Sequence, residues 1–199
     1  MTKLLFMIVA LREKIIESTI ELFSKKGYDD VSITDIAKKC KVATSTLYYH
    51  FRDKHDLLSQ VFLDVLTKMA NHFREGIDYS KPFEEQYKMA LYTAIKYLHK
   101  NKHRCNFYTI FTLAPNSPIS VAERRSYEEI CPIGQLLKKG METGVLQKRA
   151  FSEAMTLGYI PVHNYSVRNN SNKYIPAEGE INNFIASLWK ALLPQNTPA

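Results

Sequence analysis

Residues 44–50 show hydroxyl, phenol and imidazole groups where a core-packing helix would show aliphatic side chains: Thr44, Ser45, Thr46, Tyr48, Tyr49 and His50. These groups are small or flat enough to approach base edges in a major groove, and they can donate hydrogen bonds to phosphates. The flat edge of Tyr49 can also contact a thymine methyl group. No arginine lies in the segment, so bidentate recognition of guanine is not expected from it. The pattern favours a helix that lies against DNA, although an ordinary amphipathic helix with a solvated polar face would look similar.

The neighbouring residues predict the helices that would hold this segment in place. Ser32 is a good N-cap for a helix over 33–40, and Asp35 stands three residues later, near the positive end of that helix. Asp53 caps a further helix that continues to about residue 75. Thr34 and Lys54 flank the polar segment, and their hydroxyl and ammonium groups suit phosphates. Two short helices joined by a tight turn have the form of a helix-turn-helix, in which the second helix enters the major groove.

The whole pattern resembles the N-terminal signature of TetR-family transcriptional regulators. The resemblance rests on Gly27-Tyr28, Ser32, Ile36-Ala37, Val42 and, above all, Leu47-Tyr48-Tyr49-His50-Phe51-Arg52-Asp53-Lys54-His55-Asp56-Leu57-Leu58. It implies base contacts from Thr44, Ser45 and Tyr49. It implies phosphate contacts from Thr34, Thr46, Tyr48, His50 and Lys54.

Two positions depart from the family pattern. The family often has glycine where Lys41 stands in the turn, and serine or threonine where Ala43 stands as N-cap of the recognition helix. Lys41 must therefore tolerate the backbone of the turn or shift it, and Thr44 is an alternative cap.

The rest of the chain also reads as helical. Apolar residues repeat at helical spacing, as in Ile16, Ile20 and Phe23, and no segment sustains the alternation of a strand. Glycine (7) and proline (8) are scarce, which disfavours an all-β fold with many turns. A 45% hydrophobic content is ample for a core. We therefore predict an all-α fold of about nine helices.

With the resemblance, this fold divides into two domains. Residues 1–58 form a three-helix helix-turn-helix DNA-binding domain, whose fourth helix continues to about residue 75 as a connector. Residues 59–199 form a helical effector-binding and dimerisation domain. Within that domain we expect a loop at 114–118, a helix over about 121–139 kinked at Pro132, and a helix from about Ala150 interrupted by Gly158 and Pro161.

Aromatic residues are dense in the second domain, and such density could form the wall of a cavity for an apolar or aromatic effector. A plain helical core would have the same composition. The residues that we expect to line an effector pocket are Tyr87, Phe107, Tyr108, Phe111, Tyr127 and Cys131.

The last helix carries a long apolar stripe, and tryptophan is a common interface anchor. With the preceding helix and their symmetry mates it could form a four-helix interface of a homodimer, as the resemblance implies. The alternative is that it docks on its own domain. The residues of the expected dimer interface are Ile181, Phe184, Ile185, Leu188, Trp189 and Leu192.

The net charge of +7 suggests an anionic partner, but residues 1–60 carry only 10 basic against 8 acidic side chains. The excess charge is therefore not concentrated on the predicted DNA-binding domain. A basic cluster follows the helix near residue 95, and solvation is its default interpretation: Lys96, His99, Lys100, Lys102, His103 and Arg104. His99 and His103 have metal-ligand spacing, but no third ligand is evident, so no metal site is predicted.

No catalytic motif of a hydrolase, nucleotide-binding enzyme or metalloprotease occurs in the chain, and no cofactor is predicted. The three cysteines make no disulfide framework, which favours a reduced, cytoplasmic setting. The apolar run from Leu4 to Leu11 is too short to span a membrane and is expected to form the first turns of helix one, packed on the body or on a partner.

We therefore predict a dimeric repressor that binds a palindromic operator in double-stranded DNA and is released by a small effector. The alternative is an effector-less co-activator or architectural DNA-binding protein of the same fold. An α-helical enzyme or ligand carrier is a third and weaker alternative.

Overall fold

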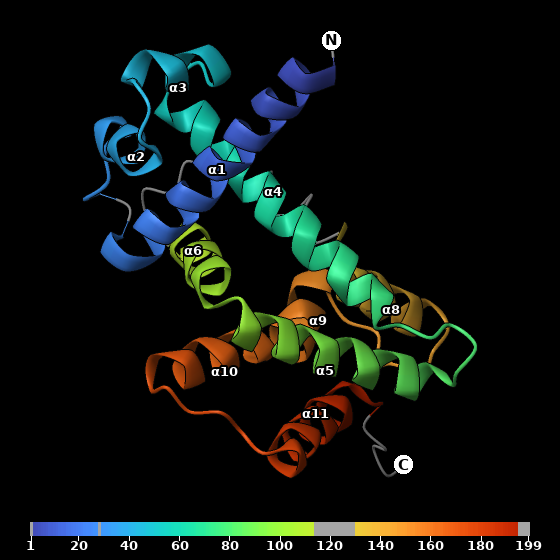
Figure 1. Ribbon diagram of the computed structural model, residues 1–199. Coiled ribbons are helices and arrows are strands. Elements are labelled where there is room, and N and C mark those ends of the chain that lie inside the picture. The colour runs from blue at the N-terminus through green and yellow to red at the C-terminus, as the bar shows by residue number, and fades with distance from the viewer. Residues whose placement is uncertain (1, 28, 114–129, 195–199) are drawn as a thin grey trace. The chain divides into compact units, whose positions relative to one another are not determined.

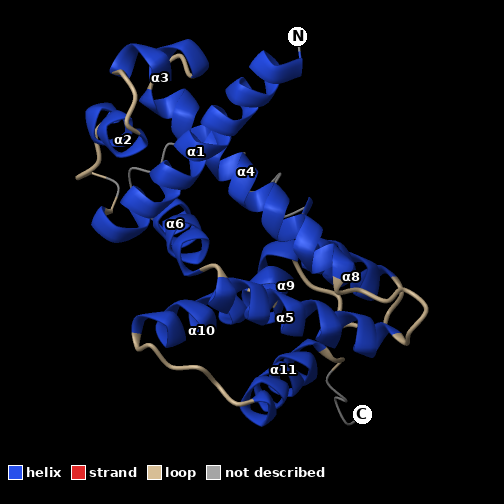
Figure 2. Ribbon diagram, in the orientation of Figure 1, coloured by secondary structure: helices blue, strands red, loops and turns tan. Residues whose placement is uncertain are grey.

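The computed structural model describes residues 2–27, 29–113 and 130–194, with side chains from residue 6 onward. Across these ranges it consists of helices joined by loops, without a strand (Figures 1 and 2). The predicted all-α fold is confirmed. The helices are α1 (Thr2–Lys26), α2 (Ile33–Cys40), α3 (Thr44–His50), α4 (Lys54–Glu75), α5 (Phe83–Lys100), α6 (Lys102–Leu113), α8 (Pro132–Glu142), α9 (Phe151–Gly158), α10 (Ile160–Ser171) and α11 (Glu178–Leu192).

The chain folds as two compact units. The first contains the described residues of Met1–Leu66 and Asn106–Val121, and the second contains those of Thr67–Cys105 and Ala122–Ala199. Helices α4 and α6 each begin in one unit and end in the other, so the units are not consecutive in sequence. Residues of α6 from Asn106 onward belong to the same unit as the helix-turn-helix.

The first unit has an apolar core that its helical periodicity predicts. Ile16, Ile20 and Phe23 of α1 are fully buried, and α1 ends at Lys26 before Gly27, which adopts a positive φ of 87°. Lysines in the last turn complement the helix dipole, and glycine tolerates the left-handed backbone that ends the helix. Further residues of this core are Ile15, Val31, Ile36, Ala37, Cys40, Leu47, Phe51, Leu57, Leu58, Val61, Phe62, Val65, Phe107 and Phe111.

The apolar N-terminal segment forms the first turns of α1, as expected. Phe6, Met7 and Val9 are largely exposed on the described part of the chain, so these side chains do not pack on the body, and packing on a partner stays a prediction. None of the described helices is long and apolar enough to cross a membrane.

The second unit is built around α5 and α9. Helix α5 packs against α8, α10 and α11, and α9 contacts the same three helices (Figure 1). The hydroxyl of Tyr87 donates a hydrogen bond of 2.7 Å to the carbonyl of Gly158, across the α5–α9 contact. A Cβ at Gly158 would lie 2.8 Å from that hydroxyl, so the close approach of these helices requires glycine.

The proline and glycine signals of this unit act at the predicted places with one difference. Gly158 ends α9 and Pro161 stands in the first turn of α10, which confirms the predicted interruption. Pro132 does not kink a helix: it is the first residue of α8, after Cys131 at the N-cap. This position needs no amide hydrogen bond, so proline fits it without strain. The expected loop at 114–118 and the expected helix over 121–129 lie outside the described residues.

Candidate nucleic-acid interface

Helix α2 begins with a reciprocal cap, as the sequence predicts. The backbone amide of Asp35 donates to the Ser32 hydroxyl (3.1 Å), and the Ser32 amide and hydroxyl donate to the Asp35 carboxylate (2.9 and 2.6 Å). These bonds, from the Ser32 side chain first, lower the pKa of Asp35 below its usual range. The cap satisfies helix-end amides and fixes where α2 starts.

The turn between α2 and α3 is built on Lys41. This residue adopts the left-handed backbone conformation, with φ 57° and ψ 46°, and therefore takes the turn without displacing it. The conformation costs a non-glycine residue roughly 1–2 kcal/mol. The Val42 amide donates to the carbonyl of Ala37 (3.1 Å) and closes the end of α2. The N-cap of α3 is Ala43, with extended backbone and no side-chain cap bond, so Thr44 does not take over capping.

Helix α3 turns one residue inward and leaves its polar groups outward. Leu47 is buried, whereas Tyr49 is 78% and Tyr48 54% exposed. Ser45 is exposed, and Thr44, Thr46 and His50 are half-buried. Tyr49 and His50 meet edge to face, with ring centroids 5.3 Å apart. A single buried anchor with exposed hydroxyl, phenol and imidazole groups is the arrangement that a groove-reading helix needs.

The two residues that flank the polar segment, Thr34 and Lys54, differ in their exposure to solvent. Thr34, in the first turn of α2, is exposed. Lys54, at the start of α4, is half-buried, and its ammonium lies 5.7 Å from the centre of the Phe23 ring. Asp53 caps α4 as predicted, since its carboxylate accepts the Asp56 amide at 2.8 Å. The Phe23 ring thus orients the Lys54 side chain before any phosphate is bound.

A polar chain that we did not predict links α1 to the exit of α3. The Arg12 guanidinium donates to the Gln60 side chain (2.9 Å), whose amide donates to Asp56 (3.0 Å). The other Asp56 oxygen accepts the backbone amide of Arg52 (2.9 Å), one residue beyond the C-cap of α3. Hydrogen bonds from Gln60 and Arg52 lower the pKa of Asp56. Residues 48 positions apart carry no shared sequence signal, so only the fold reveals this contact.

The expected effector-pocket residues do not come together at one place. Phe107 and Phe111 stack at 4.2 Å and contact Phe23, and Tyr108 stacks on Phe62, all inside the helix-turn-helix unit. Tyr87 is buried in the second unit. Cys131 caps α8 there, and Tyr127 lies outside the described residues. The aromatic residues of α6 are thus part of the core of the first unit, because their rings fill the space between α1 and α4.

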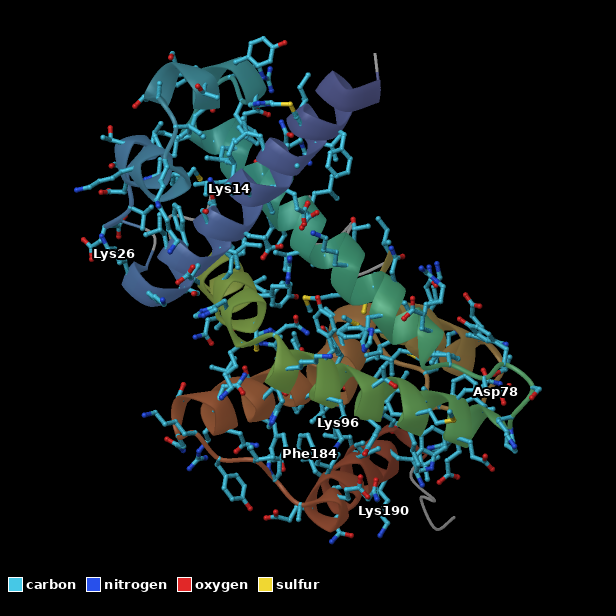
Figure 3. All side chains as sticks on the ribbon, in the orientation of Figure 1. Lys14, Lys26, Asp78, Lys96, Phe184 and Lys190 are labelled. Atoms are coloured by element: carbon cyan, nitrogen blue, oxygen red, sulfur yellow. The ribbon has the colours of Figure 1, made fainter. Side chains whose placement is uncertain are left out.

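The apolar stripe of α11 faces its own unit. Trp189 is 6% exposed, and its ring lies 5.7 Å from Tyr87 and 6.2 Å from Phe83, measured between centroids. Ile181, Ile185, Leu188 and Leu192 are buried with it. Only Phe184, which is labelled in Figure 3, is half-buried. Its ring stacks on that of Tyr165 of α10, with centroids 4.4 Å apart. The stripe is therefore mainly the docking face of α11 on α5 and α9, which is the alternative that the sequence left open.

Sequence comparisons identify the helix-turn-helix segment. The family model of bacterial regulatory proteins of the tetR family matches residues 15–61. An uncharacterized HTH-type transcriptional regulator of Haemophilus influenzae is 31% identical over 91 residues, 46% of this chain and 49% of the relative. The HTH-type negative transcriptional regulator IcaR of the biofilm operon icaADBC in Staphylococcus aureus is 44% identical over 50 residues, 25% of this chain and 27% of the relative. The chain thus matches about half or less of the length of these relatives.

The likeness of the fold extends much further along the chain. A TetR family transcription regulator of Marinobacter aquaeolei has a TM-score of 0.84 at 17% identity, covering 93% of this chain and 96% of that one. The two relatives and this fold neighbour are named as transcription regulators. Residues 15–61, with Leu47 buried and Tyr48 and Tyr49 exposed on α3, are thus similar to bacterial regulatory proteins of the tetR family, and the chain shares the fold of a TetR family transcription regulator.

Proposed function

We propose that this protein is a sequence-specific, dimeric transcriptional repressor that binds a palindromic operator in the cytoplasm. The observation that carries the proposal is the exposed polar surface of α3, held by one buried anchor, Leu47, on a capped helix pair. Thr44, Ser45 and Tyr49 contact bases in this proposal. Thr34, Thr46, Tyr48, His50 and Lys54 contact phosphates. In a dimer the two α3 helices would read half-sites roughly 34 Å apart, one turn of the double helix.

The proposed direction of regulation follows from one relative. The Staphylococcus protein that shares 44% identity over 50 residues is named a negative regulator. A repressor needs only to occupy its operator, so an exposed reading helix on a rigid unit is sufficient for that role. Activation would need a further surface for the transcription machinery.

We place the dimer interface on α10 and α11, around the half-buried stack of Tyr165 and Phe184. A stacked pair of aromatic side chains that remains partly exposed after the unit has folded is typical of an interface anchor. The buried side chains of the α11 stripe support this surface from below. The proposed interface therefore includes only part of the apolar stripe of α11. Removal of the Phe184 ring should weaken dimerisation without unfolding the protomer.

The packing of buried side chains bears on the choice between an effector-responsive repressor and the effector-less alternative. Phe107 and Phe111 pack together in the core of the first unit, which argues against an effector pocket at these two residues. Elsewhere in the second unit, buried polar atoms without hydrogen-bond partners favour an effector. We therefore propose that an effector binds in the second unit and releases the repressor from its operator.

Selection of DNA fragments bound by the purified protein tests the proposal. A palindrome should be enriched from the genome of the source organism, and a gel shift should give one complex of two protomers per site. Phe184→Ala should weaken dimerisation in light scattering with little loss of thermal stability, and Asn183→Ala, on the exposed side of α11, is the matched control. Recovery of no common sequence, or a monomer bound to a single half-site, would contradict the proposal.

A further inference from the structure

The interior of the second unit contains a polar face on an otherwise apolar helix pair. His163, Ser166 and Asn169 follow each other at intervals of three residues on α10 and therefore share one side of the helix. All three are buried, and the Ser166 side chain is completely inaccessible. Helix α10 packs on α5 (Figure 1), and most of the buried residues of α5 are apolar. A core helix in this position would normally carry aliphatic residues.

Two contacts extend this polar face onto the neighbouring helices. The Sγ atom of Cys105, in the first turn of α6, lies 3.9 Å from Nε2 of His163. The Asn170 side chain donates to the carbonyl of Leu98 (3.1 Å), which brings the end of α5, and with it His99, close to the end of α10. The polar cluster therefore consists of His99, Cys105, His163, Ser166 and Asn169.

Two atoms of this polar cluster have no hydrogen-bond partner although they are removed from solvent. They are Oγ of Ser166 and Nε2 of His99. The buried Asn169 amide lies beside them and also interacts with the Tyr165 hydroxyl. Buried polar atoms in folded proteins are nearly always paired, because an unpaired one loses its bond to water without replacement. Two such atoms, one within α10 and one near the end of α5, indicate a position for a molecule that is not part of the chain.

The chemistry of the polar cluster selects against a charged molecule. Burial raises the pKa of Cys105 to about 12 and lowers that of His163 to about 4, so both are neutral at pH 7. Among the described buried polar side chains of this unit there is no carboxylate, ammonium or guanidinium group. Burial lowers the pKa of His99, and the nearby charges of Lys102 and Lys96 lower it further, but both lysines are exposed. A buried ion would have no countercharge.

We propose that the polar cluster binds an uncharged effector, whose amide or hydroxyl group hydrogen-bonds to Ser166, Asn169 and His99 and whose apolar part lies against α5. The inference rests on the proposed function, since it names the chemical class of the molecule that releases the repressor. A primary amide satisfies the polar cluster in either tautomer of His99, because it both donates and accepts.

Four probes with the same ring test the class of ligand: benzamide, benzoate, benzylamine and toluene. Binding to the full-length protein is measured by ligand-observed NMR at millimolar concentration. Benzamide should bind at least about tenfold more tightly than the other three, a preference typical of a buried site built for hydrogen bonds. A preference for benzoate, for benzylamine or for toluene, or no binding of benzamide, would overturn the proposal.

Ser166→Ala locates the site, with Asn164→Ala on the exposed side of α10 as the matched control. Ser166→Ala should abolish benzamide binding and leave the melting temperature unchanged or raised by about 1–4 °C, because it removes an unpaired buried atom. Asn164→Ala should change neither. Benzamide binding that survives in Ser166→Ala, or a lower melting temperature, would overturn the assignment. Operator binding, measured by gel shift, should be equal in all three proteins; its absence in the wild type would refute the proposed function and not this site.

Discussion

The helix-turn-helix segment and the second unit differ in how far apart in sequence their decisive contacts lie. Residues 32–58 are organised by bonds between neighbours, such as Ser32 with Asp35 and Asp53 with Asp56. The second unit depends on contacts between distant residues, such as Tyr87 with Gly158 and Trp189 with Phe83. Local bonds leave a sequence signal at fixed spacing, whereas long-range packing does not. This contrast explains why a function can be predicted from the sequence of residues 32–58 and not from the sequence of the second unit.

The largest expected effect tests the long-range region. Trp189→Ala should lower the free energy of unfolding by about 3–5 kcal/mol, because it leaves a cavity between Tyr87 and Phe83. Denaturant titration followed by circular dichroism measures the loss. If Trp189 instead served mainly to join two protomers, the variant would be a stable monomer, and the assignment of the α11 stripe to the core would be wrong.

A pH titration of stability addresses the same unit. The folded-state pKa of His163 is lowered to about 4, so the unfolded chain binds more protons between pH 6.5 and 4. Stability should therefore be full above pH 6.5 and fall as the pH drops towards 4, by at most about 1.4 kcal/mol per pH unit from this residue. His163→Gln should flatten this part of the profile. An unchanged slope in the variant would show that other groups cause the acid sensitivity.

A smaller effect is expected for the local region. Ser32→Ala removes the N-cap of α2 and should cost about 1 kcal/mol. Because the folded-state pKa of Asp35 is lowered, its contribution is present at neutral pH and is lost as the pH falls through that pKa. Urea titrations should show a larger difference between wild type and variant at neutral than at acidic pH, because the bond from the Asp35 amide to the Ser32 hydroxyl does not depend on pH. An equal difference at both would remove Asp35 from the cap's energetics.

The sequence predicted features that depend on neighbouring residues. The bounds of α2 and α3, the caps at Ser32 and Asp53, and the break at Gly158 follow from periodicity and from special residues such as glycine and proline. Two predictions for single residues were wrong: Pro132 begins α8, and Ala43, not Thr44, is the N-cap of α3. Such residues can occupy more than one position near a helix end, so their exact place is not fixed by residue type.

Features that depend on contacts between residues far apart in the chain could not be predicted from the local sequence pattern. Phe107 and Phe111 were expected in an effector pocket, because an aromatic helix has the same composition in a cavity wall and in a packed core. The structure places these rings against Phe23, 84 or more positions earlier in the chain. The Arg12–Gln60–Asp56 chain was missed for the same reason.

The central claim is that α3 reads DNA, and a pair of variants tests it most directly. Tyr49→Ala removes an exposed side chain assigned to bases, and Lys54→Ala removes a cation assigned to phosphate; neither should change the fold. In gel shifts over a range of salt, Tyr49→Ala should cost about 1–3 kcal/mol on the selected operator and relax its sequence preference. Lys54→Ala should weaken binding to all sequences alike and reduce the salt slope by about one. Wild-type affinity and selectivity in both variants would contradict the account.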